Sequence, residues 1–321
     1  MKLIVIIPAY NEENSLPVVI REIPREIPGV DEVEVLVIND GSTDATAEVA
    51  KTSGADRVIS HKKNMGLGVT FKDGLEEALR MGADVIVNTD ADGQYNGAEI
   101  PRLIEPILKE EADVVIGNRQ IDLLDHMPWQ KKAGNKMATW VTRRVTGLPI
   151  LDAQTGFRAF SREAALRMTL VSGSYTYVQE TLIEAANKRL AVEQIPIEFR
   201  RREGPSRLIS NIFKYAKLAG ITIIRSYRDY RPFAVFAGIG VVIVGFGILV
   251  GARVLIHYLT TGMVVPYLPS AVLTAVLVIV GTQIIVFGFM ADMLKTERVI
   301  QEEILYRMKK MDIEYNGSDI I

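Results

Sequence analysis

The chain of 321 residues contains no cysteine, which excludes disulfide bonds, zinc sites built on thiolates and thiol nucleophiles. Histidine is scarce as well: the three histidines, at positions 61, 126 and 257, are too scattered for a histidine-rich metal site. Positive charge is not in excess, since the formal net charge is −2, so we expect no nucleic-acid partner. We expect no signal peptide, because the apolar run MKLIVIIP is short and leads directly into Asn11, Glu12 and Glu13.

The first two hundred residues alternate between short apolar runs and helical patterns. Strands are expected at 3–7, 33–38, 57–60, 85–89 and 113–117. Helices are expected between them, one beginning near Ser15 and others at 43–53, 69–81 and 100–110. The strands are continuously apolar, which is typical of burial on both faces, so the pattern predicts a parallel α/β sheet in which Pro8 ends the first strand.

Polar residues follow four of these strands at the point where each strand ends. The four segments are Pro8–Glu12, Asn39–Ser42, Asp90–Asp92 and Gly117–Arg119. Because ligands of such sheets bind at the carboxyl ends of the strands, we expect the four segments to converge on one site.

The acidic pair within NTDADGQY, residues 88–95, indicates what this site binds. Two like charges so close together repel each other and resist burial unless a cation lies between them. Mg²⁺ and Mn²⁺ take oxygen ligands and bridge carboxylates to phosphates, so Asp90 and Asp92 are predicted to bind one of them, with Gln94 as a neutral third ligand. Two surface aspartates in a turn are the alternative.

Two long apolar runs lie in the last hundred residues, at 233–256 and 270–290. Each reaches the roughly 20 residues that cross a bilayer, so a transmembrane hairpin is expected, with two helices buried in a soluble core as the alternative. Lys and Arg flank the outer ends of the runs, whereas the loop at 257–269 contains neither. The positive-inside rule therefore places the α/β domain and both termini in the cytoplasm of a membrane-bound protein.

Residues 207–230 combine apolar side chains at helical spacing with several Lys and Arg, which favours a helix at the membrane interface over one on a soluble core. The expected division is a catalytic domain at 1–205, interface helices at 206–231, a hairpin at 232–291, and a cytoplasmic helix and tail at 292–321. An apolar stripe at Val299, Ile300, Ile304 and Met308 could pack on the domain or on another subunit. We expect a homo-oligomer, because two spans form a small anchor.

Five ordered motifs give the chain a family resemblance. They are VIIPAYNEE (5–13), VINDGSTD (37–44), NTDADGQY (88–95), GNR (117–119) and QTGFRAF (154–160). Together they resemble glycosyltransferase family 2, and within it the dolichyl- or polyprenyl-phosphate sugar synthases, over roughly residues 1–230. The resemblance implies a GT-A (Rossmann-like) fold, a nucleotide-sugar donor, a divalent metal, and inversion at the anomeric carbon of the sugar.

The resemblance also assigns roles to single residues. The nucleoside would be held by Pro8, Ala9, Tyr10 and Glu12, its base by Asp40, and the metal on the diphosphate by Asp90, Asp92 and Gln94. Asn39 stands where relatives often have a second aspartate. Residues 64–68 resemble the segment that closes over the base, and residues 154–157 resemble a lining of the sugar pocket. Tyr177 and Glu180 match a position near the acceptor.

A lipid monophosphate acceptor needs no general base, because its second pKa is about 6 and it arrives as an anion. It needs cations, and guanidinium groups match phosphate geometry. Arg119 and Arg202 are the first candidates to hold the lipid phosphate and the diphosphate, and Arg144 is a third. Asp92 and Arg119 are the expected catalytic residues. A solvated surface position or a contact with lipid headgroups is the alternative for the other arginines.

Two other functions stay open. A processive polysaccharide synthase shares this catalytic domain, but such enzymes carry a Gln-x-x-Arg-Trp motif, which precedes neither Trp129 nor Trp140. A non-catalytic membrane scaffold on a transferase fold is the other, and it would not need to keep Asp90, Asp92 and Arg119. The sequence does not choose among UDP-glucose, UDP-N-acetylglucosamine and GDP-mannose, or between dolichyl and undecaprenyl carriers.

Overall fold

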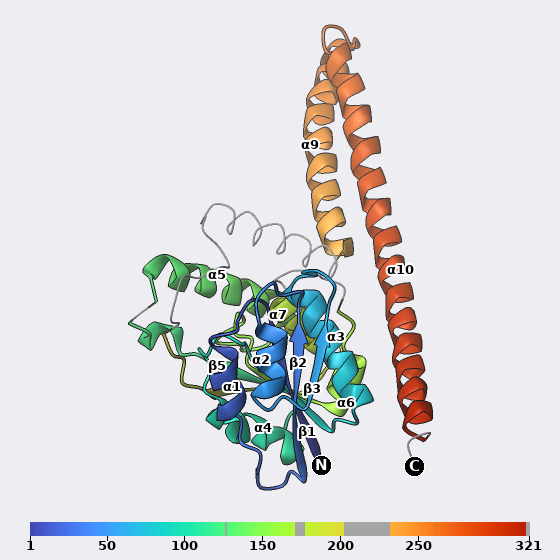
Figure 1. The fold of residues 1–321 in the computed structure, drawn as a ribbon. Helices are drawn as coiled ribbons and strands as arrows, with labels where there is room; N and C mark the ends of the chain where they lie inside the picture. Colours follow the sequence, from blue (N-terminus) through green and yellow to red (C-terminus); the bar gives the residue numbers. More distant parts are fainter. Residues whose placement is uncertain (126, 171–176, 202–231, 319–321) are drawn as a thin grey trace. The chain divides into compact units, whose positions relative to one another are not determined.

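The computed structural model describes residues 1–125, 127–170, 177–201 and 232–318. The chain forms two compact units, one of Met1–Ala219 with Leu305–Ile321 and one of Gly220–Ile304 (Figure 1). The interface helices expected at 206–231, and with them Arg207, lie outside the described residues, as does Arg202.

In the described residues of the first unit, seven strands form one sheet in the order β3-β2-β1-β4-β6-β5-β7. The strands are β1 (Lys2–Ala9), β2 (Glu32–Asn39), β3 (Arg57–Ser60), β4 (Val85–Asn88), β5 (Val114–Asn118), β6 (Arg158–Ser161) and β7 (Val192–Pro196). All neighbours are parallel except β6, which runs antiparallel to β4 and β5. The predicted strands β1 to β4 pair with one another in parallel, as expected, whereas the antiparallel β6 was not predicted from the sequence.

Helices cover both faces of this sheet. On one face, α1 (Leu16–Glu22), α2 (Thr46–Thr52) and α4 (Ile100–Leu108) pack over Leu3, Val5 and Ile7 of β1. On the other, α3 (Leu67–Arg80), α6 (Arg162–Arg167) and α7 (Tyr177–Asn187) pack over Ile4 and Ile6. Each such buried side chain contributes about 1.5–3 kcal/mol. Burial on both faces is the reason that these strands are apolar at every position.

Strand β1 continues through Pro8, where the sequence predicted its end. Ala9 faces β2, because its carbonyl oxygen accepts from Asp40 N at 2.8 Å. Pro8 therefore faces the other neighbour, β4, and β4 pairs with β1 only as far as Ile6. A missing N–H costs nothing where the ladder has already ended, so the proline is tolerated.

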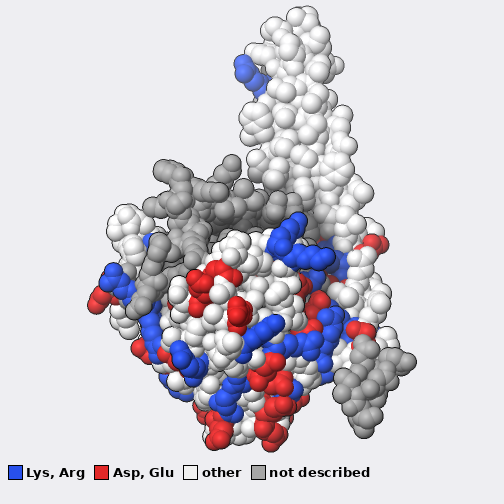
Figure 2. All heavy atoms as spheres, viewed as in Figure 1, with Lys and Arg blue, Asp and Glu red and all other residues white. Residues whose placement is uncertain are grey.

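The second unit contains α9 (Pro232–Thr261) and α10 (Leu268–Ser318) as far as Ile304. Among the described residues, these two helices are long and apolar enough to cross a membrane. Their most apolar stretches have mean hydropathies of 2.7 and 2.4, and 11% of each stretch is buried. Figure 2 shows the resulting surface, which is nearly free of charge. A helix pair in a soluble core would be mostly buried, so this exposure favours the membrane interpretation.

The two helices of this unit pack through glycine residues. A Cβ added at Gly240 would lie 2.6 Å from the carbonyl oxygen of Gly281, and one added at Gly281 would lie 2.9 Å from the carbonyl oxygen of Gly240. Gly251 makes a similar approach to the side chain of Thr274. Such small residues let two helices approach closely, and this packing drives their association where lipid replaces water.

The last part of α10, from Leu305, belongs to the first unit. The hydroxyl of Tyr306 donates to the carboxylate of Glu163 at 3.0 and 3.1 Å, and the Arg167 guanidinium lies 4.7 Å from the centre of its ring. Ile313 packs against the apolar cluster under α3 and α6. Of the apolar stripe predicted for this helix, Ile304 and Met308 are more than half exposed, and its packing on the domain or on another subunit stays a prediction.

Candidate active site

The loops that follow β1 and β2 are joined by hydrogen bonds. Asn11 N donates to Ser42 Oγ at 2.9 Å, and the Asn11 side chain accepts from Thr43 N at 2.8 Å. One residue further, Glu12 N donates to Thr46 Oγ1 at 2.9 Å. These contacts connect the first two polar segments expected from the sequence, so they act as one platform at the edge of the sheet.

The residues expected to hold the nucleoside differ in exposure on this platform. Pro8 and Ala9 are buried at the end of β1, whereas Tyr10 is 39% exposed. The carboxylate of Glu12 accepts from Ser15 Oγ at 2.8 Å. The geometry gives Tyr10 a surface on which a base can stack, while Pro8 and Ala9 position it.

Asp40, at the end of β2, is 4% exposed and organises the loop that follows β3. Its carboxylate accepts from the backbone N–H groups of Met65 and Gly66, at 2.7 and 2.9 Å, and lies 2.8 Å from His61 Nδ1. His61 was not singled out from the sequence, where a lone histidine in a basic stretch carries no signal. Asn39 bonds to Ser42 N and to Ser60 Oγ, so it belongs to the scaffold.

The acidic pair lies in the turn directly after β4. Asp92 Oδ1 accepts from Gln94 N at 3.1 Å, and both aspartates are half-buried. The carboxylate of Asp90 lies against the backbone of Gly156, where an added Cβ would be 2.9 Å from Asp90 Oδ1. Glycine at 156 is therefore needed to leave space for this carboxylate.

Gln94 is oriented from outside the turn, by a segment 106 residues away in sequence. The side-chain Nε2 of Gln94 donates to the backbone carbonyl oxygen of Arg200 at 3.2 Å, and the backbone carbonyl oxygen of Gln94 accepts from Arg200 N at 2.8 Å. With the amide nitrogen engaged, Gln94 presents Oε1 as its ligand atom.

The chemistry of these oxygens fits a hard divalent cation. Among the described residues, no group of three or more His, Asp or Glu side chains could hold a metal ion by itself. Two carboxylates and an amide oxygen would supply part of a shell that phosphate and water oxygens complete, and this is the usual arrangement for Mg²⁺ at a substrate phosphate.

Arg119, one of the two expected catalytic residues, is buried beside a carboxylate that the sequence analysis missed. Its Nε and one terminal nitrogen donate to Asp152 at 2.7 and 2.9 Å. Asp152 is fully buried and also accepts from the backbone N–H groups of Arg119 and Gln154. Burial alone would lower the pKa of Arg119, but Tyr95 and Asp152 outweigh it and raise that pKa, so the guanidinium stays charged. Asp152 stands two residues before the QTGFRAF motif, and this position was its one sequence signal.

Two buried polar residues, Tyr95 and Arg158, bond to the segment 153–156. Tyr95 OH accepts from Gly156 N at 2.9 Å, and burial raises the pKa of this hydroxyl above its ordinary value. Arg158 is 1% exposed and donates to the carbonyl oxygens of Thr155 and Ala153, at 2.9 and 3.1 Å. Its burial lowers the pKa of Arg158 to about 10, so it remains a cation at neutral pH. Neither residue was assigned a role from the sequence.

One donor in this region has no partner. The side-chain Nε2 of Gln154 is buried, and within the described part of the chain it makes no hydrogen bond. Buried polar groups in native proteins are nearly always hydrogen-bonded, so an unmet donor next to Asp152 indicates a place for a ligand oxygen.

The remaining expected residues are spread more widely. Arg144 is exposed on α5 (Trp129–Thr146), and Arg202 lies outside the described residues. Tyr177 is buried, 4.7 Å from Phe71 between ring centres, and it lies near Asp90: burial and this carboxylate raise the pKa of Tyr177. Glu180 is half-buried on the same helix, α7. The structure therefore brings Asp90, Asp92, Gln94 and Arg119 into one region and leaves Arg144 at the surface.

Known proteins are similar to this chain in sequence and in fold. Residues 4–168 match the model of glycosyl transferase family 2. The polyprenol monophosphomannose synthase of Mycolicibacterium smegmatis is 32% identical over 210 residues, covering 62% of this chain and 78% of that protein. The UDP-N-acetylglucosamine–dolichyl-phosphate N-acetylglucosaminyltransferase of Methanococcus voltae is 32% identical over 213 residues, covering 60% and 83%.

Among solved structures, one similar fold is glucosyl-3-phosphoglycerate synthase from Mycobacterium tuberculosis, in complex with Mn²⁺, UDP-glucose and phosphoglyceric acid. The TM-score is 0.53 at 24% identity, over 71% of this chain and 78% of that one. The likeness confirms the expected mixed α/β fold of the GT-A type.

Proposed function

The chain belongs to glycosyl transferase family 2 and is a glycosyltransferase, and we propose that it moves a hexose from a nucleotide diphosphate sugar to a polyprenyl monophosphate at a membrane surface. The observation that carries this proposal is the combination of the Asp90–Asp92 turn with two exposed apolar helices, α9 and α10. The turn lies in the first unit, which is called the catalytic unit from here on. Relatives named for polyprenol and dolichyl phosphate products support the choice of acceptor.

The proposed chemistry follows from the charges of the two substrates. Asp90, Asp92 and Gln94 would hold a Mg²⁺ or Mn²⁺ ion, whose charge stabilises the departing nucleoside diphosphate. The acceptor phosphate is already anionic, so this site needs no general base and its task is to position two anionic groups next to each other. An oxygen of that phosphate attacks the anomeric carbon in line with the departing group, which inverts the configuration.

Cations near the site would offset the repulsion between donor and acceptor. Arg119 supplies a buried charge held in place by Asp152. Arg202 and Arg144 are the proposed contacts to the lipid phosphate, because guanidinium binds phosphate in a bidentate manner. Gln154 Nε2 would donate to an oxygen of the sugar or the diphosphate.

A screen of nucleotide sugars tests this function. The full-length protein in membranes is incubated with UDP-glucose, UDP-N-acetylglucosamine or GDP-mannose, a prenyl phosphate, and Mg²⁺ or Mn²⁺. We expect sugar to appear in the lipid extract with at least one donor, and chelation of the metal to stop it. Product in the form of a polymer would favour a processive synthase, and no transfer with any donor would favour a scaffold.

Removal of the helices should separate catalysis from anchoring. A chain ending at Arg231 is expected to leave the membrane fraction and to keep weak activity on short, soluble prenyl phosphates only, because the long acceptor is confined to the bilayer. The truncation also removes Tyr306, so full-length Tyr306→Ala serves as the control and should remain in the membrane. Full activity of the truncated chain on a long-chain acceptor would reject the anchoring role.

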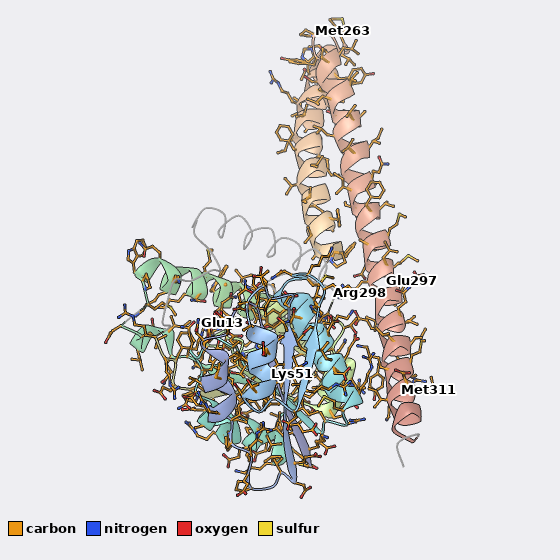
Figure 3. All side chains as sticks on the ribbon, viewed as in Figure 1. Glu13, Lys51, Met263, Glu297, Arg298 and Met311 are labelled. Atoms are coloured by element: carbon orange, nitrogen blue, oxygen red, sulfur yellow. The ribbon has the colours of Figure 1, made fainter. Side chains whose placement is uncertain are left out.

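The absence of cysteine makes the proposed topology directly testable. Met263, which Figure 3 labels, lies between α9 and α10 and is 63% exposed, whereas Lys51 lies on α2 of the catalytic unit. In intact cells, a membrane-impermeant maleimide should label Met263→Cys and should label Lys51→Cys only after lysis. The reverse pattern would invert the orientation and place the catalytic unit outside the cytoplasm.

A further inference from the structure

We propose that the donor is a uridine rather than a guanosine nucleotide, and that His61 sets this choice by filling one oxygen of Asp40. The inference rests on the proposed function, which places the base of the donor at Asp40. It goes further, because that function is compatible with either nucleotide.

The hydrogen bonds of Asp40 leave it little capacity for a base. A carboxylate has about four acceptor positions, two on each oxygen. Oδ1 accepts from Met65 N at 2.7 Å and lies 2.8 Å from His61 Nδ1, so both of its positions are occupied. Oδ2 accepts from Gly66 N at 2.9 Å. One position, on Oδ2, is left for a ligand.

The surroundings of Asp40 form a place where a base can lie. Asp40 N donates to the carbonyl oxygen of Ala9, the last residue of β1, so Tyr10 follows directly after the end of the adjacent strand. Tyr10 is 39% exposed, and Met65, whose backbone binds Asp40, is 46% exposed. An aromatic ring and a thioether are both good contacts for the face of a base.

Uracil and guanine differ in the number of hydrogen bonds that they donate to a carboxylate. The Watson–Crick edge of uracil has a single N–H, at N3, between two carbonyl oxygens, so it needs one acceptor. Guanine presents N1–H and the N2 amino group side by side, and these pair with both oxygens of a carboxylate. At Asp40, guanine would form one of its two bonds, and its amino group would be left against the occupied Oδ1. A buried donor without a partner is strongly disfavoured, by roughly tenfold or more in affinity.

The groups that bond to Asp40 are themselves held in place by further contacts. Nε2 of His61 lies 3.1 Å from Oδ2 of Asp73 on α3, so the ring is fixed at both nitrogens. Gly41 brings the chain against the backbone of Lys63, because a Cβ at this position would overlap it. The loop that carries Met65 and Gly66 cannot withdraw without breaking these contacts, so the acceptor count of Asp40 is a stable property of the site.

The test compares the affinities of UDP and GDP for the full-length protein in detergent with Mn²⁺, measured by isothermal titration calorimetry. We expect UDP to bind at least about tenfold more tightly than GDP. His61→Ala empties one position on Oδ1 and should reduce the ratio of the two affinities severalfold. His61→Asn, whose side-chain amide can still donate to Oδ1, should restore the ratio. Lys62→Ala, at the exposed neighbouring position, is the matched control and should keep the wild-type ratio.

Each outcome bears on a different claim. GDP binding as tightly as UDP would overturn the uridine proposal and leave the transferase proposal intact, because a guanosine donor would then be the substrate. Equal losses of both affinities in His61→Ala, with their ratio unchanged, would show that His61 only supports the loop and would reject its role in selection. If neither nucleotide binds the wild-type protein, the proposed function fails together with this inference.

Discussion

Asp92→Ala is expected to abolish sugar transfer, by at least about 10²–10³-fold, while leaving the fold intact. The large effect follows from the proposed role of this carboxylate, which holds the charge that stabilises the departing diphosphate. The small effect on stability follows from its position, because Asp92 is half-buried in a turn, where its carboxylate accepts from Gln94 N. Losing one such bond costs about 1 kcal/mol.

The measurement is the initial rate of transfer into lipid across a titration of Mn²⁺, together with the melting temperature of the same preparation. Glu105→Ala is a suitable control, because Glu105 is 56% exposed on α4 and pairs with a surface lysine, Lys109, in a contact worth little. Normal turnover of Asp92→Ala with metal in excess would remove the metal assignment from the acidic pair.

Asp152→Ala is expected to destabilise the catalytic unit by roughly 3–5 kcal/mol, because it leaves the Arg119 guanidinium buried without its counter-charge. The side chains of the pair are 9% and 0% exposed, so solvent cannot replace the lost partner. We expect a fall in melting temperature on the order of 10 °C. Tryptophan fluorescence reports on this unit alone, since both tryptophans, Trp129 and Trp140, lie on α5.

Two further variants separate stability from catalysis at this pair. Asp122→Ala breaks an ion pair with Lys136 whose side chains are 72% and 60% exposed, so its melting temperature should hardly change. The double variant Asp152→Leu/Arg119→Met replaces both charges with apolar groups and should recover most of the stability. If Arg119 contributes its charge to the reaction, the double variant stays inactive although it is folded. Full activity in the double variant would show that the pair is only structural.

Local patterns were sufficient to predict most of the elements and part of the site. The strands β1 to β5 and the helices between them were visible because each buries an apolar face along its own length. The apolar runs of α9 and α10 were visible for the same reason. Asp90, Asp92 and Gln94 were found because they lie within five residues of each other, so their relation is a property of one turn.

Other parts of the site are made of segments that meet only in the folded chain. Asp152 pairs with Arg119, 33 residues away, and Gln94 is oriented by Arg200, 106 residues away. Glycine at 156 is required only because β6 pairs antiparallel with β4 and brings Gly156 against Asp90. No periodicity in any of these segments reports on the partner.

The sequence by itself determined the alternation of strands and helices, the two apolar runs and the acidic turn, because each depends on residues close together in the chain. The tertiary structure alone decided the direction of β6, the burial of Arg119 beside Asp152, and the three hydrogen bonds on Asp40. It also decided the hydrogen bond between Tyr306 of α10 and Glu163. The physical reason is that pairing between distant segments depends on how the packed layers bring their backbones together, and this geometry leaves no trace in the local order of residues.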